Sequence, residues 1–184
     1  MAIKFDFNKL RTAVTGWPPG SDQTGTSLTA GEQAVYIPKL RTAVPGFLTW
    51  SAALSLEHHH SGYTVVTGDT SAGILTLPTA AEAGAGWHID IMINHDQASN
   101  ATHITVGDGY FIGGLMLADK DTSDKTEHFM SDGDSNDWIN LDDATKGNDP
   151  GGVIRIVCDG TNWLVSGLLI GDGTLATPFA DAES

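Results

Sequence analysis

The chain has 184 residues and a net charge of −14 at pH 7, because 9 Lys and Arg stand against 23 Asp and Glu. This excess of acid argues against nucleic acid as a partner, since binding to phosphates needs clustered basic side chains. The length fits a single domain with an arm, and the 22 glycines indicate a globular protein rich in turns.

An internal repeat marks the N-terminal part. Residues 9–14 and 39–44 share the sequence KLRTAV, and each copy is followed within a few residues by Gly, Pro and an aromatic residue. Residues 1–50 hold five basic and three acidic residues, a net charge of +2, whereas residues 51–184 hold four basic and 20 acidic residues, a net charge of −16. We therefore predict an extended N-terminal arm over residues 1–55. The two copies are interpreted either as a strand duplicated within the fold or as equivalent segments that dock on repeated sites of a partner.

From about residue 61 the pattern becomes typical of β-strands. The clearest strand is 87–93, where Trp and Ile alternate with His, Asp and Met, the period of two of a half-buried strand. Residues 153–158 and 163–170 flank the turn sequence Asp-Gly-Thr-Asn and predict a β-hairpin. Further strands are predicted at 63–66, 74–77, 102–106, 110–112 and 115–117.

These strands recur at short intervals between Gly-rich turns, which is typical of an all-β fold. We predict an antiparallel β-sandwich or barrel over residues 56–184. Residues 118–152 interrupt the pattern, with ten acids and three lysines. A long segment without periodicity is usually functional or a surface insertion, so we predict an acidic loop insertion there.

Part of this insertion resembles a calcium-binding loop, because oxygen ligands at alternating positions suit hard cations. In the EF-hand register, the sequence departs from the motif where Asp137 replaces the required Gly and where the last ligand is Asp instead of Glu. The alternative is a solvated acidic loop with Asx turns, in which Asp and Asn bond their own backbone. The candidate metal ligands are Asp132, Asp134, Asn136 and Asp143.

No other pattern indicates a cofactor or catalysis. The chain has neither a Gly-x-Ser-x-Gly elbow nor a Walker loop, and histidines near acids are expected by chance in so acidic a chain. His58–His60 could offer metal ligands between symmetry copies; the simpler interpretation is a polar link between the arm and the β domain. We predict that the protein is not an enzyme and has no cofactor.

The single cysteine, Cys158, excludes an intramolecular disulfide and is expected to be a buried, inert thiol. No apolar run approaches the ~18 residues of a membrane helix, and the N-terminus lacks the apolar core of a signal peptide. We therefore expect synthesis in a cytoplasm and no membrane partner. Trp87 and Trp163 are predicted core residues, whereas Trp17 and Trp50, in the arm, are candidates for a partner surface.

Five segments together resemble a pattern found in tailed-phage virion proteins. The pattern is a strand ending in Leu-Pro and small residues, a Gly-rich turn, an alternating strand, a Thr-Ile-Thr-Val-like strand, and a closing hairpin with Asp-Gly-Thr-Asn-Trp. It covers 63–112 and 153–170 and includes neither the repeat nor the acidic insertion. The segments that carry it are 73–81, 84–87, 89–93, 101–106 and 153–163.

This pattern is similar to capsid decoration (cement) proteins and to domains of tail fibres and spikes. The chain length resembles a decoration protein, which implies a homotrimer that binds the major capsid protein on the outer capsid surface of the virion, after synthesis in the host bacterial cytoplasm. The alternative is a tail-fibre module or a receptor- or glycan-binding module. In a decoration protein the arm would meet the capsid, through the candidate residues Lys9, Leu10, Arg11, Val14, Trp17, Lys39, Leu40, Arg41, Val44, Phe47 and Trp50.

Overall fold

The computed structural model describes residues 46–68, 73–94, 102–121, 125–141 and 143–181. All of them belong to one compact unit, Pro38–Ser184. The predicted capsid contacts at Lys9, Leu10, Arg11, Val14, Trp17, Lys39, Leu40, Arg41 and Val44 lie outside the described residues.

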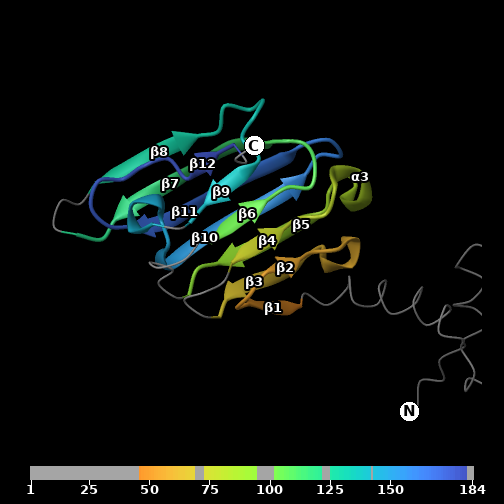
Figure 1. Cartoon of the computed structure of the whole chain (residues 1–184), viewed down its shortest axis with the longest axis horizontal. Coiled ribbons are helices and arrows are strands. Elements are labelled where there is room, and N and C mark those ends of the chain that lie inside the picture. Colours follow the sequence, from red (N-terminus) through yellow and green to blue (C-terminus); the bar gives the residue numbers. More distant parts are fainter. Residues whose placement is uncertain (1–45, 69–72, 95–101, 122–124, 142, 182–184) are drawn as a thin grey trace, which may run out of the picture. The chain divides into compact units, whose positions relative to one another are not determined.

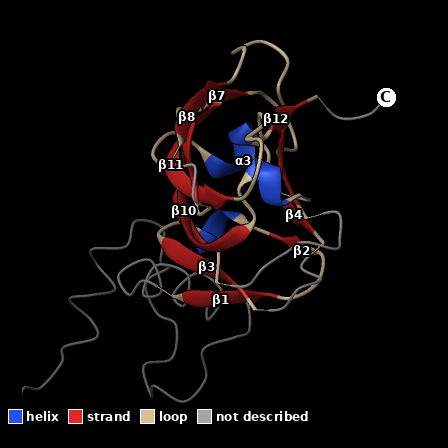
Figure 2. Cartoon of the chain, turned by 90° about the vertical axis from the view of Figure 1, so that its left-hand side faces the viewer, coloured by secondary structure: helices blue, strands red, loops and turns tan. Residues whose placement is uncertain are grey.

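Two β-sheets pack face to face, which confirms the predicted all-β sandwich (Figures 1 and 2). The strand order is β1-β3-β5-β10-β11-β7-β8 in the seven-stranded sheet and β12-β9-β6-β4-β2 in the five-stranded sheet. The strands are β1 (Phe47–Trp50), β2 (Leu54–Ser55), β3 (Tyr63–Thr67), β4 (Ile74–Thr76), β5 (His88–Met92), β6 (His103–Thr105), β7 (Phe111–Asp119), β8 (Thr126–Met130), β9 (Trp138–Asn140), β10 (Asp149–Cys158), β11 (Trp163–Gly171) and β12 (Phe179–Ala180).

The helices of the described residues are short: η1 (His58–His60), α3 (Ala80–Ala83) and η2 (Ala144–Lys146). Within this part of the chain, no helix has the length and apolar character needed to cross a bilayer.

The sheets are mixed, which corrects the antiparallel expectation. From β1 to β6 the chain alternates between the two sheets, so β1, β3 and β5 are parallel neighbours in one sheet, and β2, β4 and β6 in the other. Strands that cross between facing sheets return in the same direction, and parallel pairing follows. The predicted hairpin is confirmed, because β10 and β11 pair antiparallel from Cys158 opposite Trp163 to Val153 opposite Leu168.

The predicted domain limits need two corrections. β1 and β2 already belong to the sheets, so the sandwich includes residues 47–55, which the sequence analysis placed in the arm. Residues 118–152 are not a loop throughout, because they contain β8, β9 and the start of β10. β8 is an exposed edge strand and β9 has three residues, so neither shows a clear apolar alternation in the sequence.

The core lies between the sheets. In β5, the side chains of Ile89 and Ile91 are fully buried and Met92 is exposed, as the alternating pattern predicts. Trp87 and Trp163 also lie in the core, as predicted, and their rings meet edge to face with centroids 5.5 Å apart. Cys158 is buried, and burial raises the pKa of its thiol, so the thiol stays protonated at neutral pH.

Candidate functional site: an apolar sheet face and an acidic corner

The two candidate capsid contacts inside the described residues lie on opposite sides of β1. Phe47 is 74% exposed, whereas Trp50 is fully buried in the core. Positions three apart in a strand point to opposite faces, so one strand could not present both rings to a partner. Trp50 is therefore a core residue, which corrects its assignment to a partner surface.

The outward face of the seven-stranded sheet carries a continuous apolar row. Five side chains from adjacent strands are direct cross-strand neighbours, in the order Val66, Met92, Val153, Leu168 and Met116. The last four are each 37–42% exposed. Neighbouring side chains on one sheet face are close enough to form a single surface. The row therefore runs across β3, β5, β10, β11 and β7 without a polar interruption.

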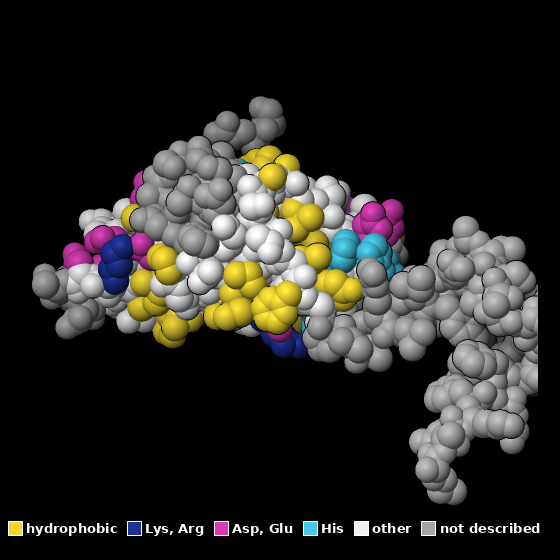
Figure 3. Space-filling model, turned by 90° about the horizontal axis from the view of Figure 1, so that it is seen from below, with side chains coloured by type: hydrophobic (Ala, Val, Ile, Leu, Met, Phe, Trp, Pro, Cys, Tyr) yellow, Lys and Arg dark blue, Asp and Glu magenta, His cyan; other side chains and the backbone are white. Residues whose placement is uncertain are grey.

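Three more exposed side chains extend this row along the strands: Phe47, Leu164 and Met130, the last 59% exposed. We call the five residues of the row and these three the apolar face. Figure 3 shows hydrophobic side chains gathered in a band on the β1 side of the molecule, beside a basic and an acidic side chain. Large exposed apolar patches usually mark interaction sites.

The charge of this face differs from that of the chain. Among the outward positions of the described strands of this sheet, only Asp90 and Arg155 carry a full charge at pH 7, and they are cross-strand partners. Arg155 donates to Asp90 over 3.3 Å. Exposed pairs of this kind add little stability, but this pair leaves the face neutral in a chain of net charge −14.

A shallow hollow of about 360 Å³ lies at one end of the row. Phe47, Val66, Met92 and Val153 border it, and residues 151–152 form part of its floor. The β10 register shifts between Asp149 and Val153, and the glycines at 151 and 152 place no side chain in the hollow. A protruding apolar side chain of a partner would fit this depression.

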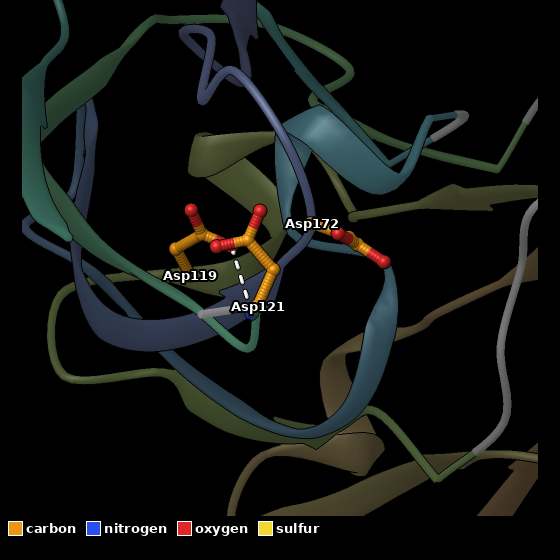
Figure 4. A group of neighbouring side chains, drawn as sticks. All are labelled: Asp119, Asp121 and Asp172. Carbon is orange, nitrogen blue, oxygen red and sulfur yellow. Dashed lines mark hydrogen bonds between the residues drawn. The ribbon is translucent and has the colours of Figure 1, made fainter. Parts of the chain in front are cut away.

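An acidic corner lies at the far end of β7 (Figure 4). Asp119 ends β7, Asp121 follows it, and Asp172 follows β11; one carboxylate oxygen from each lies within 4.8 Å of the other two. The Asp119 carboxylate also accepts the backbone N–H of Asp121 over 3.0 Å. The parallel register sets Gly171 opposite Asp119, which brings together side chains about 50 positions apart.

Lys120 supplies positive charge beside this corner. Its Nζ lies 2.6 Å from Asp149 and 3.6 Å from Asp172. Asp149 is only 2% exposed, and its Oδ2 accepts no hydrogen bond from the described residues. The hydrogen bond to Asp149 raises the pKa of Lys120. The ammonium thus occupies the place beside the buried carboxylate that a cation would otherwise fill.

Replacing Lys120 with methionine is expected to lower the free energy of unfolding at neutral pH, because it leaves the buried Asp149 carboxylate without its counterion. The raised pKa fixes the sign of the pH dependence: the contribution is complete below the ordinary lysine pKa of 10.5 and is lost as the pH rises through the folded value. Urea unfolding at neutral and alkaline pH measures it. The difference from wild type should shrink above pH 10.5. Lys125→Met, at an exposed lysine beside β8, is the control and should match wild type.

The candidate calcium loop is held together by its own hydrogen bonds. The Asp132 carboxylate accepts the backbone N–H groups of residues 134–136 and the Ser135 hydroxyl, and these bonds lower its pKa. Asn136 bonds Asp181 and the backbone of Asp132, and Asp143 caps η2 by accepting from Thr145 N–H. The described carboxylates that gather are at the acidic corner and do not include Asp132, Asp134 or Asp143. The backbone hydrogen bonds to Asp132 are those of the Asx-turn alternative.

His58–His60 form the 3₁₀ helix η1 and bond within the domain. The His58 ring lies 2.9 Å from the carbonyl of Glu82, and the His60 ring accepts the backbone N–H of Glu57. These bonds attach η1 to α3 and close its N-terminal end at the N-cap residue Glu57. His58–His60 thus belong to the sandwich and follow β1 and β2 along the chain.

Neither the apolar face nor the acidic corner is predicted from the sequence. One signal for the face was present: residues 163–170 form a nearly continuous apolar run, typical of a strand covered on both faces. The acidic corner could not be predicted from local sequence, because Asp172 joins Asp119 and Asp121 only through the pairing of β11 with β7.

Comparison with known protein families, with curated proteins and with solved structures finds no match to this chain.

Proposed function

We propose that this chain is a structural virion protein that decorates and stabilises the outer surface of a tailed-phage capsid. It would act as a homotrimer and bind the major capsid protein through its N-terminal arm. The observation that carries the proposal is the pair of KLRTAV copies, of which the second ends at Val44, just before β1. A segment repeated with identical sequence suits a partner that offers repeated sites.

The attachment of the arm supports this function. β1 is an edge strand, with β3 as its neighbour in the sheet, and edge strands have free backbone groups for strand addition. Phe47, three positions after the end of the second copy, is exposed. A capsid presents many equivalent sites, so modest contacts at each site add up through avidity.

The charge distribution is consistent with the same arrangement. The mildly basic arm would lie on the capsid, and the strongly acidic sandwich would face solvent. Excess negative charge keeps densely displayed copies soluble and apart. The segments that resemble virion proteins fall on β4, β5, β6 and the β10–β11 hairpin.

Substitutions in the repeat test the proposal. Leu10→Ser with Arg11→Glu changes the first copy, and Leu40→Ser with Arg41→Glu changes the second. Either change alone should weaken binding to capsids of the encoding phage by about tenfold or more, and both together should abolish it, because avidity needs both contacts. Co-sedimentation with capsids measures the bound fraction.

Lys125→Glu, an equal charge reversal on the sandwich, is the control and should bind like wild type. The proposal fails if the chain with all four changes decorates capsids normally. A deletion version of this experiment must stop before residue 46, because removal of β1 would also remove the buried Trp50.

A further inference from the structure

We propose that the apolar face of the seven-stranded sheet is the surface through which copies of this chain bind one another. This inference deepens the oligomer part of the proposed function and rests on it for the number of copies. It does not depend on what the arm binds.

The first argument comes from the strand pattern. In β11, Val165 and Leu169 point into the core, while Leu164 and Leu168 point outward and are 43% and 37% exposed. Strands that are apolar on both faces are normally covered on both faces. In a single chain, nothing among the described residues covers the outward side. The sequence of β11 is therefore that of a strand with a second layer over it.

The second argument is the size of the face. Adjacent strands lie ~4.8 Å apart and outward residues recur every ~6.7 Å along a strand. The whole outward face of the sheet, seven strands by three rows of outward residues, thus measures on the order of 500 Å² in projection, and more in accessible area. The apolar row spans five of these seven strands. A stable interface buries roughly 800 Å² per partner. One sheet face of this size comes close to that requirement.

The third argument selects the partner. Two copies of a chain with net charge −14 repel each other at most surfaces. The outward face of the seven-stranded sheet is an exception, because the one acid that its described strands place there, Asp90, is paired with Arg155. A strongly basic partner would be matched by acids on this face, which the described strands do not place there. A neutral, apolar face on an acidic protein suits contact with the same face of other copies of the chain.

The hollow at the end of the row would make this contact complementary in shape. It is open to solvent in the single chain and is bordered by members of the apolar face. A side chain of a neighbouring copy would fill it. Phe47, the most exposed large hydrophobic side chain of the described residues, would be covered at the same time.

The test changes the middle of the row in the full-length chain. Leu168→Lys places a charge in the proposed contact. Val153→Glu with Leu168→Lys does the same without changing the net charge, and these two positions are cross-strand partners, so the new pair supports the sheet. Ile74→Lys is the matched control: Ile74 is 38% exposed, close to Leu168 at 37%, but lies in β4 of the other sheet.

Sedimentation velocity over a wide concentration range measures association, and far-UV circular dichroism checks the fold. We expect wild type and Ile74→Lys to sediment as a multiple of the 19.3 kDa chain. Both variants of the row should sediment as folded monomers, with association weakened on the order of 100-fold. A monomeric wild type overturns the inference, and so do row variants that associate normally.

Capsid co-sedimentation separates this inference from the proposed function. If the wild type associates through the apolar face but does not bind capsids, only the proposed function fails. If the wild type is monomeric and the row variants lose capsid binding, the face docks on the capsid instead, and the inference fails.

Discussion

Replacing Trp163 with alanine is expected to lower the free energy of unfolding by about 3–5 kcal/mol, the usual cost of removing a large buried aromatic ring. Trp163 is fully buried, meets Trp87 edge to face at 5.5 Å, and donates its indole N–H to the carbonyl of Asp108 over 3.0 Å. It also pairs with Phe111 on β7 and with Cys158 on β10. A cavity here would therefore loosen three strands together.

Substitution by phenylalanine separates the contribution of ring packing from that of the hydrogen bond to Asp108. Trp163→Phe is expected to cost about 2–3 kcal/mol, because it loses the bond to Asp108 and part of the ring contact. Trp50 is the matched control, since it is equally buried but its indole N–H meets no acceptor among the described residues. Trp50→Phe removes that unsatisfied donor and should stay within about 1 kcal/mol of wild type.

Guanidinium unfolding followed by far-UV circular dichroism measures these differences without depending on tryptophan emission. Equal losses for the two phenylalanine variants would show that the bond to Asp108 contributes nothing, and a loss below about 1 kcal/mol for Trp163→Ala would contradict the central position of this ring.

Gly113→Ala is expected to have a comparable effect, about 3–5 kcal/mol, from strain and overpacking together. Gly113 has φ +127°, a conformation that other residues rarely adopt, and an added Cβ would lie 2.2 Å from the carbonyl oxygen of Val165. Gly113 and Val165 are direct partners in the parallel β7–β11 ladder. An alanine would force β7 away from β11 in the seven-stranded sheet.

Gly133→Ala isolates the backbone part of this cost. Gly133 has φ +82° with no atom within 4 Å of an added Cβ, so only the left-handed backbone is penalised, by about 1–2 kcal/mol. Chemical unfolding of the two variants side by side gives the difference. If both lose the same stability, the contact with Val165 is not the cause.

The sequence predicts the parts of the fold that depend on local chemistry. The alternation at 87–93 identifies β5 because one face of that strand meets the core, and the turn at Asp159–Asn162 identifies the β10–β11 hairpin because the Asp159 carboxylate bonds the backbone of Thr161 and Asn162. Neither feature requires knowledge of distant residues.

Features that depend on pairing could not be predicted in this way. Parallel and antiparallel strands show the same period of two, so the alternation of β1 to β6 between the sheets leaves no trace in the sequence. β7 is also interpreted as two runs, 110–112 and 115–117, because Gly113 and Gly114 interrupt the apolar pattern, although the strand continues through them.

The candidate sites also divide into those set by local sequence and those set by strand pairing. The Asp132 carboxylate accepts backbone N–H groups of its own neighbours, a local arrangement that the sequence predicts as Asx turns. The acidic corner and the apolar face result from register between strands far apart in the chain. Trp50 illustrates the limit for single residues: its place next to the repeat favoured a surface role, and the sheet places it inside.

The parallel β7–β11 pairing also has a kinetic consequence. Phe111 meets Trp163, which lies 52 positions further along the chain, whereas the β10–β11 hairpin closes over a four-residue turn. Closing a long loop has a larger entropic cost, and non-local strand pairing slows folding. The hairpin would therefore form first and offer the edge on which β7 later docks, so the β7–β8 side of the seven-stranded sheet is completed late.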